Sequence, residues 1–234
     1  MSQEIEANIL NIRQRIAAAA ARAGRDPSGI RLMAVSKTVE PERIRSALDA
    51  GITLLGENYV QEAREKISAV GRSAEWHMIG HLQTNKAKYV VHLFDWIHSV
   101  DRLDLARELD KRAGGHNRLL NVLIEVNVSG EASKNGAQPS GVPELVRQIS
   151  TLPNLAVRGL MTMPPYSDNP ENSRPYFQAL RRLRDEINAA AVPNVRMDEL
   201  SMGMTDDFEV AIEEGATIIR VGRAIFGQRH YPPQ

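Results

Sequence analysis

Arg31-Leu32-Met33-Ala34-Val35-Ser36-Lys37 is the stretch on which the prediction of the fold depends. It is a short apolar run that follows Gly29 and precedes Pro41, which is typical of a buried strand. The run ends in Lys37, and burial makes a lysine amine a nucleophile that forms a Schiff base with a carbonyl compound. Most lysines at strand ends are simply hydrated, so a function for Lys37 has to be argued from the rest of the chain.

The alternation of an apolar segment with a helical segment recurs along the whole chain. Seven further segments have the composition of strands: 53–58, 75–80, 95–100, 119–128, 156–161, 195–201 and 217–222. Helical patterns separate them, at 42–50, 60–68, 85–91, 102–113, 143–152, 171–191 and 206–214. Eight strands that alternate with helices, at about 30 residues per unit, predict an α/β fold of the (β/α)8 TIM-barrel type. An open doubly wound sheet would need a glycine-rich turn after an early strand, and the first strand runs into Ser36-Lys37-Thr38 instead.

An additional helix precedes the first strand. Helix 4–23 ends at Gly24, and four isoleucines recur in it at helical spacing: Ile5, Ile9, Ile12 and Ile16. The sequence holds no linker or low-complexity tract that would divide it. We therefore expect one domain over residues 1–234, with an extra N-terminal helix.

The composition excludes several functional classes. There are 29 Lys and Arg residues and 29 Asp and Glu residues, and a formal net charge of zero argues against a general nucleic-acid binder. The absence of cysteine excludes a disulfide framework, a thiolate nucleophile and a cysteine zinc site. No stretch reaches the length of a membrane span, and the N-terminus lacks the apolar core of a signal peptide, so we expect a cytoplasmic protein.

Residues at the strand ends are the candidates for chemistry, because the strand ends of a barrel meet at one mouth. They include Lys37 after the first strand, Asn58 after the second, and His77 and His81 near the third. The two histidines have no third ligand at metal-binding spacing, and the sequence contains neither H-E-x-x-H nor G-x-S-x-G. We therefore expect neither a metal site nor a serine hydrolase.

The ends of the last two strands predict an anion site. Barrels often bind phosphate with the loops after strands seven and eight. Ser201 offers a hydroxyl there, and Arg223 adds positive charge. Gly203 and Gly222 allow backbone N–H groups to approach an anion closely. A lone strand-end glycine is more often a turn residue, but two glycines with a serine at these two strands favour phosphate binding.

Arg220 interrupts the apolar eighth strand, and two interpretations of it stay open. A buried charge needs a partner, so Arg220 forms an ion pair with an acid such as Glu125 or Asp198, or it faces a ligand. Two polar loops, 129–141 after strand five and 163–171 after strand six, also lie at the predicted mouth. They are either lids or solvated connections.

Taken together, these segments resemble the family of pyridoxal phosphate (PLP) homeostasis proteins of the YggS/PROSC type. The resemblance covers nearly the whole chain and is carried by ordered motifs at 34–38, 56–62, 76–86, 97–101, 159–161, 200–207 and 220–227. It implies a fold-type III barrel similar to the N-terminal domain of alanine racemase. It also implies that Lys37 holds PLP as a Schiff base and that Arg220 lies near the pyridine nitrogen.

The remaining cofactor-binding residues are also implied by this resemblance. Ser201, Gly222 and Arg223 are expected to hold the phosphate. Asn58, His81 and Met202 complete the expected set, and His81 stands where some members have proline.

The resemblance also implies a function, a carrier in vitamin B6 homeostasis without catalytic residues. Its expected partners are PLP and, as acceptors, PLP-dependent apoenzymes, with no nucleic acid and no membrane. The alternative is an amino-acid racemase of the alanine racemase type. Such an enzyme uses a second domain and a tyrosine base from a partner subunit, and this sequence ends at Gln234, soon after the eighth strand. We therefore expect a monomeric carrier.

Overall fold

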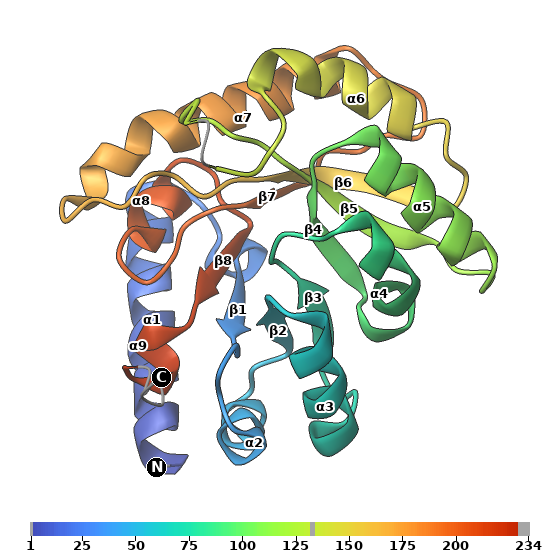
Figure 1. Ribbon diagram of the computed structural model, residues 1–234. Coiled ribbons are helices and arrows are strands. Elements are labelled where there is room, and N and C mark those ends of the chain that lie inside the picture. The colour runs from blue at the N-terminus through green and yellow to red at the C-terminus, as the bar shows by residue number, and fades with distance from the viewer. Residues whose placement is uncertain (1, 132–133, 229–234) are drawn as a thin grey trace.

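The computed structural model describes residues 2–131 and 134–228 and contains a closed barrel of eight parallel strands (Figure 1). The strands follow one another around the barrel in sequence order, and β1 pairs with β8 to close it. They are β1 (Arg31–Val35), β2 (Leu54–Glu57), β3 (Glu75–Met78), β4 (Trp96–Val100), β5 (Leu120–Glu125), β6 (Leu155–Met161), β7 (Glu199–Ser201) and β8 (Ile218–Val221). The predicted (β/α)8 barrel is confirmed.

Helices alternate with the strands and cover the outside of the barrel (Figure 1). The α-helices are α1 (Ser2–Arg22), α2 (Pro41–Asp49), α3 (Val60–Val70), α4 (Ala87–Leu93), α5 (Leu103–Gly114), α6 (Val142–Ile149), α7 (Arg174–Ala189), α8 (Phe208–Glu213) and α9 (Arg223–Phe226). Four short 3₁₀ turns accompany them: η1 (Pro27–Gly29), η2 (Thr84–Lys86), η3 (Pro139–Gly141) and η4 (Pro170–Ser173). No helix of the described residues is both long and apolar enough to cross a bilayer.

β1 is apolar on both faces because each face meets a different core. On β1, Met33 and Val35 belong to a small cluster that also contains Leu54 and Ile218. Ala34, between them in sequence, belongs to the large cluster that also contains the buried helix residues. Alternate residues of a strand point to opposite faces, so the small cluster lies inside the barrel and the large one joins the barrel to the helices.

The predicted N-terminal helix is confirmed as α1. The isoleucines recognised in the sequence are all buried, with Ile5 at 0% and Ile9 at 1% relative exposure. The helix packs against α2, α8 and α9, so it covers the seam where the first and last strands of the barrel pair (Figure 1). Full burial of an isoleucine contributes about 1.5–3 kcal/mol, which makes this helix a substantial part of the core.

The structure differs from the prediction near the end of the chain. β7 begins at Glu199 rather than at residue 195. Asn188 of α7 bonds both backbone groups of Met197, accepting from its N–H at 3.1 Å and donating to its carbonyl at 3.2 Å. These groups are therefore unavailable to a neighbouring strand. The short helix α9, directly after β8, is an additional element.

Candidate functional site

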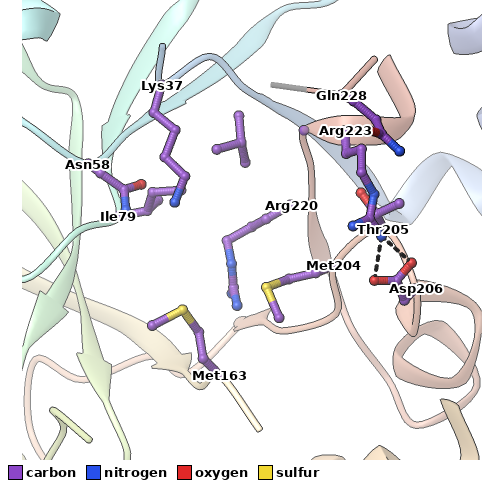
Figure 2. Close-up of a pocket in the computed structure, with 12 residues that line it drawn as sticks. Lys37, Asn58, Ile79, Met163, Met204, Thr205, Asp206, Arg220, Arg223 and Gln228 are labelled. Carbon is purple, nitrogen blue, oxygen red and sulfur yellow. Dashed lines mark hydrogen bonds and ion pairs between the residues drawn. The ribbon is translucent and has the colours of Figure 1, made fainter. Parts of the chain in front are cut away.

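A pocket of about 470 Å³ lies at the C-terminal ends of the strands (Figure 2). It brings together five of the predicted cofactor-binding residues: Lys37, Asn58, Arg220, Gly222 and Arg223. Figure 2 shows Lys37 and Asn58 on one side, Arg223 on the other, and Arg220 between them. The rest of the lining consists of Val35, Ile79, Met163, Met204, Thr205, Asp206 and Gln228.

A buried polar cluster holds the backbone that carries Lys37. The ammonium group of Lys66 donates to the carbonyl of Ser36 and to Glu57 Oε1 at 2.9 Å. The hydroxyl of Ser36 donates to the same carboxylate oxygen at 2.7 Å. After Lys37 the chain turns at Thr38, whose φ of 62° is unusual for a residue other than glycine. Because Lys66 and Glu57 are both buried, they fix the residue that precedes the lysine of the pocket.

Arg220 is held by oxygen atoms of the barrel itself. Its Nη1 donates to the carbonyl of Ser201 at 2.7 Å and to the hydroxyl at 2.8 Å, and its Nη2 donates to the carbonyl of Thr162 at 2.8 Å. Burial lowers its pKa to about 10, so the guanidinium remains charged at neutral pH. Of the two interpretations left open by the sequence, the structure shows Arg220 at the pocket, while Asp198 pairs with Arg196 at 2.6 Å.

Asn58 supplies a polar atom that is available to a ligand. Its Oδ1 is buried and has no hydrogen-bond partner among the described residues. A buried acceptor without a partner is destabilising, and such atoms mark places where a ligand or water completes the network. Gly80 packs directly against the Asn58 backbone, because a Cβ atom at Gly80 would lie 2.4 Å from the carbonyl oxygen of Asn58. The position of Asn58 therefore depends on this glycine.

The opposite side of the pocket combines a hydroxyl, a glycine and a cation. Gly222 directly precedes α9, and Thr205 lies in the loop after β7. The Arg223 guanidinium binds both oxygens of Asp206, at 2.6 and 2.8 Å (Figure 2). The sequence pattern indicated Ser201 as the hydroxyl of this site, whereas the structure places Thr205 in the lining. The available signal is that a second hydroxyl, that of Thr205, follows Ser201 by four residues in the loop after β7.

Three predicted cofactor-binding residues do not line this pocket. Ser201 is buried and bonds Arg220 and His98. Met202 is buried in the large core cluster, and His81 is exposed beside a second cavity. Their assignment to cofactor binding stays a prediction.

A second cavity, of about 750 Å³, adjoins the first. Asn58, Ile79 and Met163 line both. Met163 and Asn135 belong to the two polar loops, so both loops border this cavity, although residues 132 and 133 lie outside the described part of the chain. Asn127 closes the first loop by donating to the carbonyl of Glu131 at 2.8 Å. In the described residues, no group of three or more His, Asp or Glu side chains is arranged to hold a metal ion.

Comparisons with known proteins show the family and the fold of this chain. The family model for the N-terminal domain of alanine racemase matches residues 4–230. A pyridoxal phosphate homeostasis protein from Aquifex aeolicus is 51% identical over 219 residues, which is 93% of this chain and 95% of the relative. A structure of an unknown protein from Bifidobacterium adolescentis superposes with a TM-score of 0.92 at 39% identity, covering 96% of this chain and 95% of that one.

A second solved structure covers nearly the whole chain. PipY of Synechococcus elongatus, solved with PLP bound, has a TM-score of 0.80 at 36% identity and covers 91% of this chain and 100% of its own. Both the sequence relationship and the fold extend over nearly the full length of these relatives. The chain therefore belongs to the family of pyridoxal phosphate homeostasis proteins, within the larger family defined by the alanine racemase N-terminal domain.

Proposed function

We propose that this protein binds PLP as a Schiff base on Lys37 and acts as a PLP carrier in vitamin B6 homeostasis. The observation that carries the proposal is the pocket itself, in which Lys37 shares one space with Arg220 and Arg223. The unpartnered Oδ1 of Asn58 supports it, because this atom is suited to accept a hydrogen bond from a ligand. The names of the relatives and the PLP found in PipY support the identity of the ligand.

The residues of the pocket fit the parts of the cofactor. The Lys37 amine is suited to the aldehyde, and Gly222, Arg223 and the Thr205 hydroxyl are suited to the phosphate. Arg220 is suited to the ring nitrogen. When bound, PLP supplies an electrophilic carbon that captures amines. Because Arg220 remains a cation, it opposes protonation of the ring nitrogen and weakens the ring as an electron sink, which favours storage over carbanion chemistry.

The lining also favours a carrier over a racemase. Racemisation requires a proton acceptor on each face of the bound substrate. Among the described residues that line the pocket, the groups able to accept a proton are Lys37 and Asp206, and Asp206 is bonded to Arg223. The described lining of this pocket contains neither tyrosine nor histidine, and Tyr59, Tyr89 and His81 line the adjoining cavity instead. We further propose that the protein works as a monomer in the cytoplasm, as one domain, and passes PLP to PLP-dependent apoenzymes.

The cofactor and its anchor are tested together by absorbance and chemical trapping. We expect the purified protein to be yellow, or to become yellow with added PLP, and borohydride to attach the cofactor covalently to the peptide that contains Lys37. The Lys37→Ala variant should lose both signals, whereas Lys88→Ala, which changes an exposed lysine, should keep them. A wild type that does not bind PLP, or a label on another peptide, would overturn the proposal.

The racemase alternative has its own assay. Incubation with L-alanine should yield no D-alanine above the level of the Lys37→Ala control. Turnover that depends on Lys37 would overturn the assignment as a carrier while leaving the PLP site intact.

A further inference from the structure

A network of hydrogen-bonded side chains crosses the barrel from its N-terminal end to the Lys37 pocket. Glu75, at the start of β3, lies 3.2 Å from Nε2 of His77. Nδ1 of His77 lies 2.8 Å from Nε2 of His98, and Nδ1 of His98 lies 3.0 Å from the Ser201 hydroxyl. That hydroxyl accepts from Arg220 Nη1 at 2.8 Å. Both histidines and Ser201 have no solvent exposure, whereas Glu75 is exposed.

The first three members of this network, Glu75, His77 and His98, have defined protonation states. Hydrogen bonds from His77 and Arg31 lower the pKa of Glu75 to about 2, so its carboxylate only accepts hydrogen bonds. Burial lowers the pKa of His77 to about 4 and that of His98 well below its usual value. The charged groups around His77 are Glu75, Arg31 and Asp95. For His98, His77, Arg220 and Arg31 add to the effect of burial and lower its pKa further. Each ring is therefore neutral at pH 7 and carries one N–H.

Only one arrangement of protons satisfies every hydrogen bond in the network. Nε2 of His77 must donate to the Glu75 carboxylate, which leaves Nδ1 of His77 as an acceptor. Nε2 of His98 must then donate to it, which leaves Nδ1 of His98 as an acceptor for the Ser201 hydroxyl. The single proton of Ser201 is thus directed to His98, and a lone pair of its oxygen faces Arg220.

We propose that His98 is a positioning residue for Arg220, acting through Ser201. By accepting the Ser201 proton, His98 keeps the serine oxygen oriented as an acceptor, and this oxygen and two carbonyls hold the guanidinium in place at the pocket. The inference gives Ser201 a role different from phosphate donation, because its one proton is already used. Its effect on the cofactor rests on the proposed function, but the order of the protons does not.

The proton order is tested by NMR on the full chain, without added cofactor and again with PLP. In protein with ¹⁵N-labelled histidine, long-range proton–nitrogen correlations distinguish the two tautomers. We expect His77 and His98, assigned from His77→Gln and His98→Gln spectra, to be neutral Nε2–H tautomers at pH 7. A charged ring at either position, or an Nδ1–H tautomer at His98, would overturn the inference whether or not PLP binds.

The positioning role is tested by removing the acceptor and then restoring it. His98→Leu cannot accept from Ser201, and we expect bound PLP to dissociate about tenfold faster, with a changed visible spectrum. His98→Gln retains an acceptor oxygen and should recover most of the difference, and His92→Gln, at an exposed position, should match the wild type. Unchanged dissociation in a folded His98→Leu variant, or no recovery in His98→Gln, would refute the role.

Ser201→Ala provides the same test with a smaller change in volume, should His98→Leu not fold. It removes the oxygen that accepts from Arg220, so PLP should dissociate faster in this variant as well. If PLP dissociated from the Ser201→Ala variant at the wild-type rate, this result would refute the role of the network in positioning Arg220. A wild type that fails to bind PLP overturns the proposed function instead and leaves the NMR result standing.

Discussion

Glu125 is a buried carboxyl group on β5 with an unusual environment. Its relative exposure is 4%, and its Oε2 has no hydrogen-bond partner among the described residues. Burial, assisted by the negative charge of Asp101 and opposed by Arg220, raises its pKa to about 7. The group is therefore partly protonated at neutral pH, which makes the stability of the barrel depend on pH.

The sign of this dependence follows from the direction of the shift. The folded protein holds the Glu125 proton more tightly than the unfolded chain, whose pKa is near 4.5. The stabilisation is complete below pH 4.5 and is lost as the pH rises to about 7. The side chain in Glu125→Gln does not titrate, so only the wild type loses this stabilisation as the pH rises. The free energy of unfolding of the variant relative to the wild type should therefore rise by up to about 3 kcal/mol between pH 4.5 and 8.

Urea unfolding of both proteins at several pH values measures this difference. His77 acts in the opposite direction, because its lowered pKa gives stability that is present above pH 6.5 and lost as the pH falls to about 4. Both proteins contain His77, so its effect cancels in the comparison. Parallel stability profiles for the two proteins would show that Glu125 is ionised normally.

Lys66 is the second residue whose environment predicts a large effect. Its ammonium group bonds Glu57 at 2.9 Å and Glu62 at 2.6 Å, and burial raises the pKa of Glu57 although Lys66 opposes the shift. Lys66→Met leaves the Glu57 carboxylate buried without its cation, which should lower the free energy of unfolding by about 3–5 kcal/mol.

A second substitution separates the lost charge from the lost packing. Adding Glu57→Gln to Lys66→Met should recover part of the stability, because no buried charge then lacks a partner. Lys88→Met, at an exposed site, should change stability by no more than about 0.5 kcal/mol. Urea denaturation gives all three values, and a Lys66→Met variant as stable as the control would contradict the interpretation.

Helix α1 is the element whose contribution can be isolated most cleanly. Ile9 is 1% exposed and belongs to the large core cluster, whereas the adjacent Leu10 is 58% exposed. Ile9→Ala should cost about 2–5 kcal/mol of stability, and Leu10→Ala, a truncation of the same size in the same helix, less than about 0.5 kcal/mol. Thermal and urea unfolding measure both. Equal losses in the two variants would mean that α1 does not pack on the barrel as described.

The closed barrel predicts how the whole molecule unfolds. β1 pairs with β8, and α1 packs against α8 and α9, so the two ends of the sequence belong to one core. We expect a single cooperative transition, with the fluorescence of Trp76 and Trp96 changing together with far-UV circular dichroism. Both tryptophans lie in the first half of the chain, while circular dichroism reports all helices. Separate transitions would contradict the expectation of one domain over residues 1–234.

Much of the architecture follows from the sequence because its signals are local. The strand from Arg31 and the helix from Pro41 are recognisable from neighbouring residues, since apolar runs, helical spacing, glycine and proline act over a few positions. Once eight such units are counted, barrel geometry brings their strand ends to one mouth. The strand-end positions of Lys37, Asn58 and Gly222 follow from this geometry, whereas the family resemblance implied that these residues share one cofactor site with Arg220 and Arg223. All five residues lie in one pocket.

The sequence by itself determined the order of the elements and the lysine at the end of β1. The tertiary structure alone decided the partners of Arg220, the place of Thr205 in the pocket, and the position of His81 outside it. Such contacts depend on the register between strands and on the course of loops, where a shift of one residue turns a side chain to the other face. His98 and Ser201 are 103 positions apart, so only the closed barrel brings their side chains within 3.0 Å.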